Sequence, residues 1–133
     1  MRKNHVKNSE NETLKSGGLI IKDGKILLVS SNNKIFGIPK GHLEVGETII
    51  EGGIREIKEE TGFDVRIIKE LPAIKYQYEE TGEKVFLQYY LYEIVSGKIK
   101  PEPNTFLGWF TKEESFKVVP YENEREIIEK AYE

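Results

Sequence analysis

The chain alternates between short runs rich in β-branched or aromatic residues and clusters of turn residues, a pattern that predicts a β-sheet. The runs at 16–21 and 25–30 flank Asp23-Gly24, a dipeptide that favours a two-residue hairpin turn. The run at 84–93 is largely apolar on both faces, which favours a central strand covered on both sides. Further strands are expected at 35–38, 65–70, 73–78 and 106–111, with 94–100 continuing the central strand around Ser96-Gly97.

Helical spacing of apolar residues appears instead at 49–61 and at 121–132, with a short helical turn at 112–116. Thr48 and Glu51 fit a capping box that opens the first helix, and Gly62 can close it in a left-handed conformation. The residues expected to face the core are Ile50, Ile54, Ile57 and Thr61 in this helix, and Tyr121, Ile128 and Tyr132 in the last one. Strands mixed with helices predict an α/β protein.

Length and composition fit one domain. The 133 residues are enough to bury a substantial core, and we expect a single domain over 14–133 after a polar, flexible tail or short edge strand over 1–13. His5 in that tail is expected to be solvated. The net charge of −3 argues against a general polyanion-binding surface, and the absence of cysteine excludes disulfides and thiol catalysis.

The apolar runs also bear on location. They are too short to cross a bilayer, and residues 1–4 (MRKN) lack the apolar segment of a secretory signal. We therefore expect a cytoplasmic protein with no membrane partner.

Three carboxylates, Glu56, Glu59 and Glu60, lie at helical neighbour spacing in the 49–61 segment. They repel one another and crowd the C-terminal half of the helix, where the macrodipole favours cations. A hard divalent cation would compensate, since Mg²⁺ and Mn²⁺ prefer oxygen ligands. Gly52 and Gly53, each costing about 1 kcal/mol relative to Ala in a helix interior, would leave room for a loop, metal or phosphate. On these residues alone, a solvated acidic helix remains an open alternative.

The residues at 41–63 together distinguish a metal site from a solvated acidic helix. Its residues occupy every position of the Nudix box: Gly41, Glu47, Arg55-Glu56-Ile57, Glu59-Glu60 and Gly62-Phe63, separated by five, seven, one and one residues. With average residue usage, such a match arises by chance about once in 10⁹ starting positions. The sequence therefore resembles the Nudix hydrolases. The resemblance implies a Nudix-type α/β/α sandwich with a mixed sheet and metal-dependent hydrolysis of nucleoside diphosphate derivatives.

The resemblance also implies roles for the box residues. Glu56, Glu59 and Glu60, with the carbonyl of Gly41, would bind Mg²⁺ or Mn²⁺, and Glu56 would also orient or deprotonate the attacking water. Arg55 would hold a carboxylate in place, and Glu47 would act as an outer-shell partner. The sequence departs from the family at 106–108 (FLG), where members often carry an acidic residue before the strand tryptophan. The nearest preceding acid is Glu102, so the general base is open.

The segment Pro39-Lys40-Gly41-His42, expected in a loop over 39–44, resembles the diadenosine tetraphosphate hydrolases, as do Tyr78 and the ending at 121–126. The implied reaction yields ATP and AMP. Such a substrate needs cations for its phosphates and aromatic faces for its bases. The candidates are Lys40, His42 and Lys84 for the phosphates, and Tyr76, Tyr78 and Tyr121 for the bases. Core packing is an equal alternative for each tyrosine.

Two other functions remain open. One is a Nudix pyrophosphatase acting on a damaged or canonical nucleotide, ADP-ribose, an RNA 5′ end or a diphosphoinositol. The other is a Nudix-fold module that senses a nucleotide without hydrolysing it, which the intact carboxylate set argues against. The acidic net charge argues against long nucleic acids, because these are bound through basic tracks. A monomer and a homodimer are both compatible with the sequence.

Overall fold

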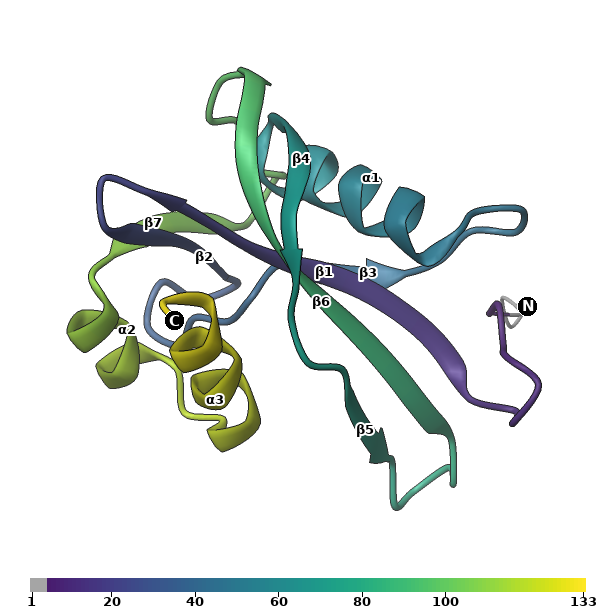
Figure 1. Cartoon of the computed structure of the whole chain (residues 1–133). Helices are drawn as coiled ribbons and strands as arrows, with labels where there is room; N and C mark the ends of the chain where they lie inside the picture. Colours follow the sequence, from purple (N-terminus) through teal and green to yellow (C-terminus); the bar gives the residue numbers. More distant parts are fainter. Residues whose placement is uncertain (1–4) are drawn as a thin grey trace.

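The computed structural model describes residues 5–133 (Figure 1). Its elements, in order, are β1 (Thr13–Lys22), β2 (Lys25–Ser30), β3 (Lys40–His42), α1 (Ile49–Thr61), β4 (Phe63–Glu70), β5 (Ile74–Gln77), β6 (Lys84–Gly97), β7 (Phe106–Phe110), α2 (Lys112–Val118) and α3 (Glu122–Ala131).

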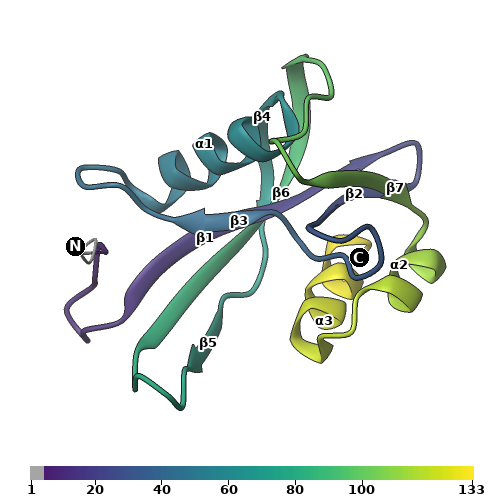
Figure 2. The ribbon, with the colours of Figure 1, turned by 180° about the vertical axis from the view of Figure 1, so that it is seen from behind.

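The strands form one mixed sheet in the order β4-β6-β1-β2-β7, with β3 paired to β1 and β5 to β6. Strand β1 runs parallel to β6 and antiparallel to β2 and β3. Helix α1 covers one face, and α2 and α3 lie against the other, as Figures 1 and 2 show from opposite sides. This is the α/β/α sandwich that the sequence predicts.

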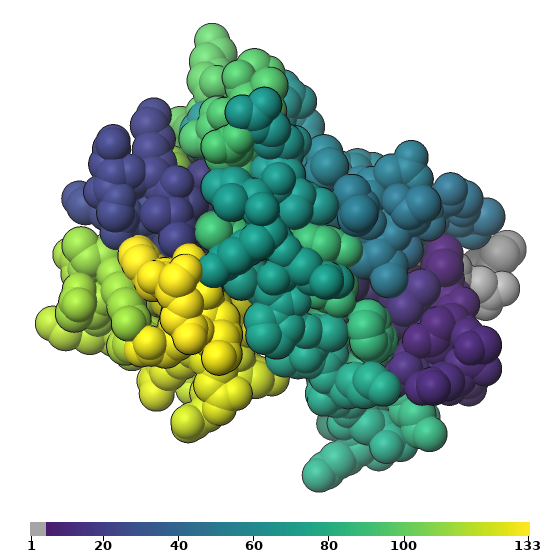
Figure 3. Space-filling view, in the orientation of Figure 1, coloured from purple at the N-terminus to yellow at the C-terminus, as the bar shows by residue number. Residues whose placement is uncertain are grey.

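Alternation along the strands divides the core between the two faces. Leu19 and Leu28 belong to the cluster that includes Ile127 and Ile128 of α3, whereas Ile20 and Leu27 belong to the cluster around Ile57 of α1. Successive strand residues point to opposite faces, so one strand supplies both layers. The space-filling view shows the helical layers packed closely against the strands (Figure 3).

Several local predictions are confirmed. Ile21 pairs with Ile26 in the hairpin, whose turn residues Asp23 and Gly24 both have positive φ. Strand β6 is central, lies between β4 and β1, and continues to Gly97. Helix α1 begins with the predicted capping box at Thr48.

The predicted core stripe of α1 is wrong at Ile50, which is 47% exposed. The helix instead turns its glycines inward: Gly52 and Gly53 are buried with Ile57 and Thr61. A Cβ at Gly53 would overlap the Tyr92 hydroxyl and Ser16 Oγ, and a Cβ at Gly52 would press on Leu43. The two glycines thus allow α1 to lie close to the sheet and the preceding loop.

One strand prediction, one loop prediction and one helix prediction also change. The expected strand at 35–38 reduces to a single bridge between Val29 and Gly37, while the expected loop at 39–44 contains strand β3. Strand β3 approaches β1 at Gly17, where a Cβ would overlap the Pro39 carbonyl. Helix α3 starts after Tyr121, which is 56% exposed and therefore does not belong to the core stripe.

The expectations for the N-terminus fall partly on residues 1–4, which lie outside the described residues. Within the tail, Lys7 bridges to Thr13, and the side chain of Asn8 accepts the backbone N–H of Glu12. His5 is half-buried and stacks on His42 with ring centroids 3.7 Å apart, rather than being fully solvated. No helix within residues 5–133 is long and apolar enough to span a membrane.

Candidate active site

Arg55 lies at the centre of the box residues. Its Nε and Nη2 donate to both carboxylate oxygens of Glu47, at 2.6 and 3.0 Å. Its Nη1 donates to Glu56 at 3.0 Å and to Glu59 at 3.1 Å, and Nη2 also donates to the carbonyl of His42 at 2.9 Å. One guanidinium therefore joins helix α1, the loop before it and strand β3.

This network accounts for two pKa shifts. The hydrogen bond from Arg55 holds the pKa of Glu47 below its usual value, although partial burial acts in the opposite direction. Its carboxylate neighbours, Glu47 first, raise the pKa of Arg55. Both groups are therefore ionised at neutral pH, and the pair is a fixed structural element of the site.

Glu56 and Glu60 lie on the side of α1 that faces β3. A Cβ at Gly41 would overlap the Glu56 carboxylate, so the missing side chain brings the strand backbone against it. Burial raises the pKa of Glu56, opposed by Arg55, and burial together with repulsion from Glu56 raises the pKa of Glu60 to about 8. The charge of Glu102 raises both values further, which places the 98–105 loop beside the helix.

These residues fit a hard cation chemically. Glu60 Oε2 is buried without a hydrogen-bond partner. Such a buried oxygen is unfavourable in free energy, and a bound cation would stabilise it. Among residues 5–133, no three carboxylate or imidazole side chains converge as they stand, because Glu56 and Glu59 point to Arg55. Glu60, Glu56 and the adjacent backbone of Gly41 are the best placed donors, whereas Glu59 is half-exposed at the rim.

Strand β3 separates this acidic face from two groups of cations and aromatic rings. Because strand residues alternate, Gly41 faces α1 while Lys40 and His42 face the opposite side of the sheet. His42 is the register partner of Lys15 on β1. Lys40 Nζ lies 3.7 Å from Glu124 on α3.

The first group joins Tyr76 and Tyr78 of the β5 hairpin to Lys15. The ammonium of Lys15 donates to the Tyr76 hydroxyl at 3.1 Å and to the Tyr78 hydroxyl at 3.4 Å, and the two rings meet edge to face. The hydrogen bond with Tyr76 and the charge of Lys15 lower the pKa of Tyr78, while burial raises that of Tyr76. Tyr76 is half-buried and packs against the core, whereas Tyr78 is exposed.

The second group lines a cavity of about 310 Å³ that contains both Lys40 and Tyr121. Glu124, also in its wall, is 4% exposed and accepts the backbone N–H of Ile38 at 2.9 Å. This buried carboxylate fixes the segment that leads into β3. Lys84, in contrast, lies at the outer end of β6, opposite Gln77.

The sequence did not single out Lys15 or Glu124. Both come from elements without box residues, and their partners are at least 60 positions away in the chain. Strand β1 also carries Thr13, Ser16 and Lys22, so no local pattern marks Lys15 as a site residue.

Comparison with known proteins decides the family. The NUDIX domain model matches residues 14–131. The chain belongs to the Nudix family. Two relatives are the "Putative mutator protein MutT4" of Mycobacterium tuberculosis, 31% identical over 74% of this chain, and the "ADP-ribose pyrophosphatase" of Methanocaldococcus jannaschii, 33% identical over 62%. This Nudix chain spans 42% and 52% of these two proteins, respectively.

Solved structures agree on the fold. A NUDIX hydrolase from Nitrosomonas europaea has a TM-score of 0.76 at 23% identity, covering 91% of this chain and 88% of its own. A MutT NUDIX hydrolase from Burkholderia pseudomallei has a TM-score of 0.73 at 26% identity, covering 89% and 96%. These likenesses establish the Nudix architecture. They do not choose a substrate.

Proposed function

We propose that this Nudix chain is a metal-dependent hydrolase that cleaves a phosphoanhydride bond in nucleoside diphosphate derivatives. The observation that carries the proposal is the pair Glu56 and Glu60 on one side of α1: Glu56 lies against Gly41, and Glu60 Oε2 is buried without a hydrogen-bond partner. Bound Mg²⁺ or Mn²⁺ would neutralise phosphate oxygens and make a water nucleophilic near neutral pH.

The chain's own residues would prepare the site for this reaction. Arg55 fixes the orientation of Glu56 and Glu59 and ties them to the loop through Glu47. Glu56 lies against the β3 backbone at Gly41 and is the candidate for orienting or deprotonating the water. Lys40 on the other side of the strand would meet a phosphate, while Glu102 is a second candidate base in the loop beside the helix.

For the substrate, the names of the relatives favour a MutT-type nucleotide or an ADP-ribose-like compound over a dinucleotide. One observation favours diadenosine tetraphosphate as a second candidate. Lys15 with Tyr76 and Tyr78 forms a cation–aromatic group separate from the cavity of Lys40 and Tyr121, and a dinucleoside polyphosphate carries two bases to be stacked. We therefore keep both substrates in the proposal.

A substrate panel tests the proposal. Initial rates with Mg²⁺ on ADP-ribose, an oxidised deoxynucleoside triphosphate and diadenosine tetraphosphate would identify the preferred class. Glu59→Gln should remove turnover while leaving the fold unchanged by circular dichroism. Turnover that survives in Glu59→Gln with unchanged metal affinity would overturn the assignment of Glu59 as a ligand. Nucleotide binding without any turnover in the wild type would favour the sensing module instead.

A further inference from the structure

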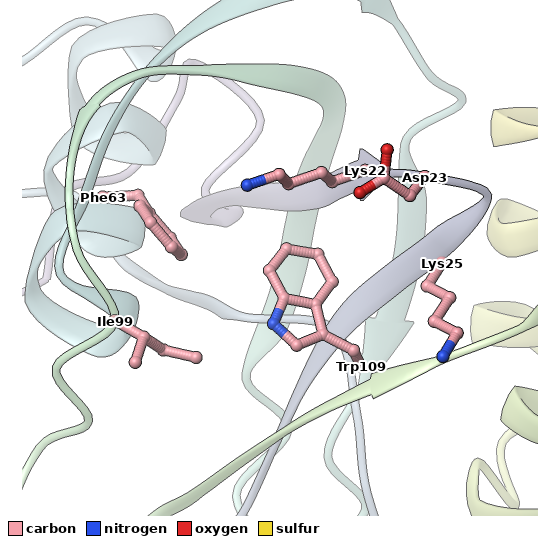
Figure 4. Close-up of a pocket in the computed structure, with 6 residues that line it drawn as sticks. All are labelled: Lys22, Asp23, Lys25, Phe63, Ile99 and Trp109. Carbon is pink, nitrogen blue, oxygen red and sulfur yellow. The ribbon is translucent and has the colours of Figure 1, made fainter.

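A second cavity, of about 420 Å³, lies beside the β1–β2 hairpin (Figure 4). Its walls are the indole of Trp109 on β7, the ring of Phe63 at the start of β4, and the side chain of Ile99. Trp109 stands in the middle, Phe63 and Ile99 lie across from it, and Lys22 extends over the indole with its ammonium towards the Phe63 side. Asp23 and Lys25 complete the rim.

This cavity is distinct from the carboxylate site. The 97–100 segment is pinned to the end of α1, because Lys100 N–H donates to the carbonyl of Thr61 at 2.8 Å. Ile99 faces the Trp109 cavity, whereas Lys98 and Lys100 line another cavity that contains Glu59 and Glu102. The two cavities therefore share one wall but open on different sides of it.

The lining has a specific chemical character. Trp109 is only partly buried and Ile99 is 47% exposed, so apolar surface remains accessible at the surface of the molecule. Lys22 forms no ion pair with another residue in the range 5–133. The rim of the cavity carries two ammonium groups, those of Lys22 and Lys25, and one carboxylate, that of Asp23. An indole face with apolar walls suits a planar ring, and an unpaired ammonium beside it suits an anion.

We propose that the Trp109 cavity is a second binding site, for a planar aromatic ring that carries a phosphate, that is, a nucleoside monophosphate. The ring stacks on Trp109 between Phe63 and Ile99, and the phosphate meets Lys22. Neither Lys22 nor Trp109 belongs to the site proposed for hydrolysis, so this inference stands independently of that activity. A bound ring would contact Ile99, whose neighbours in sequence, Lys98 and Lys100, line the Glu102 cavity.

Intrinsic fluorescence tests the proposal, because Trp109 is the single tryptophan. AMP titrated into the full chain in EDTA should change the emission in a saturable way, with adenosine and inorganic phosphate each binding more weakly. Ile99→Asp places a negative charge in the wall and should weaken the AMP response at least about tenfold. Ile68→Asp, at a comparably exposed position of β4, is the matched control and should leave it unchanged.

Lys22→Glu provides a second variant that leaves the apolar wall intact, with Lys34→Glu as its control. The proposal predicts loss of the AMP response in Lys22→Glu only. An equal response in wild type and both test variants would overturn it. So would an emission change that follows protein concentration rather than AMP, because the cavity would then be covered by a second copy of the chain.

Discussion

Arg55 is the residue on which the arrangement of the acidic face depends. It is 22% exposed at its side chain and holds Glu47, Glu56 and Glu59 together by charge-assisted hydrogen bonds. Each of these carboxylates would repel the others without it. The sequence motif identified these residues as a set, but their distances follow from the fold.

Replacing Arg55 should therefore affect both activity and stability. Arg55→Ala leaves Glu47 and Glu56 without their guanidinium, and we expect a loss of about 2 kcal/mol in the free energy of unfolding and a drop in kcat of roughly 10²-fold or more. Arg55→Lys should recover part of the stability but little of the rate, because an ammonium cannot bind a carboxylate bidentately. Urea unfolding and steady-state rates measure both, with exposed Arg66→Ala as the control.

The contribution of Glu47 to the free energy of unfolding should depend on pH. Its pKa is lowered in the folded chain, so its contribution to stability is present above the unfolded value near 4.5 and is lost as pH falls through the folded value. Glu47→Gln should therefore be less stable than wild type at pH 7, and the difference should shrink below about pH 4. Urea unfolding across pH 3–7 measures it. A difference that stays constant over this range would mean that Glu47 acts through packing rather than charge.

Some helices and strands could be predicted from residues adjacent in sequence, whereas others depend on close contacts between segments far apart in the chain. The capping box of α1, the Asp23-Gly24 hairpin and the central position of β6 were predictable because each rests on residues adjacent in sequence. Strand β3 and the rotation of α1 were not. Both depend on glycines that meet partners far away in the chain, such as Gly53 against Tyr92. The spacing of apolar residues along α1 does not reveal that contact.

Gly53→Ala tests this packing. Alanine would gain about 1 kcal/mol of helix propensity, but its Cβ overlaps the Tyr92 hydroxyl and Ser16 Oγ, so we expect a net destabilisation of about 1–3 kcal/mol. Gly52→Ala meets the side chain of Leu43 instead and should cost less. Thermal and urea unfolding compare the two. Stabilisation in Gly53→Ala would show that α1 has room to move away from the sheet.

In the molecule as a whole, the two sides of the sheet carry different groups of candidate site residues. The acidic face of α1 lies on one side of β3, and the cation–aromatic groups around Lys15 and Lys40 lie on the other. The box residues of this site were predictable from their spacing. Lys15 and Glu124 lie on the other side of β3, and only the folded chain brings them to the candidate substrate residues Tyr76, Tyr78 and Lys40.

A site that holds excess negative charge should make the fold sensitive to divalent cations. Adding Mg²⁺ after EDTA treatment should raise the Tm, since ligand at about 100-fold its Kd adds about 2.7 kcal/mol of stability. The increase should be lost in Glu60→Gln, whereas exposed Glu79→Gln should keep it. An equal rise in Tm for all three proteins would indicate non-specific ion binding rather than a site at Glu60.

Hydrolysis in heavy-oxygen water with Mg²⁺, with the products resolved by mass spectrometry, tests the proposed hydrolase activity. We expect that a nucleoside diphosphate derivative is cleaved and that one product gains a single heavy oxygen on phosphorus. With diadenosine tetraphosphate, the predicted products are ATP and AMP. Two ADP molecules as products would mean that a different phosphoanhydride bond is cleaved by the same hydrolytic chemistry. Intact substrates throughout the panel, or cleavage without oxygen incorporation at phosphorus, would contradict the proposed hydrolase.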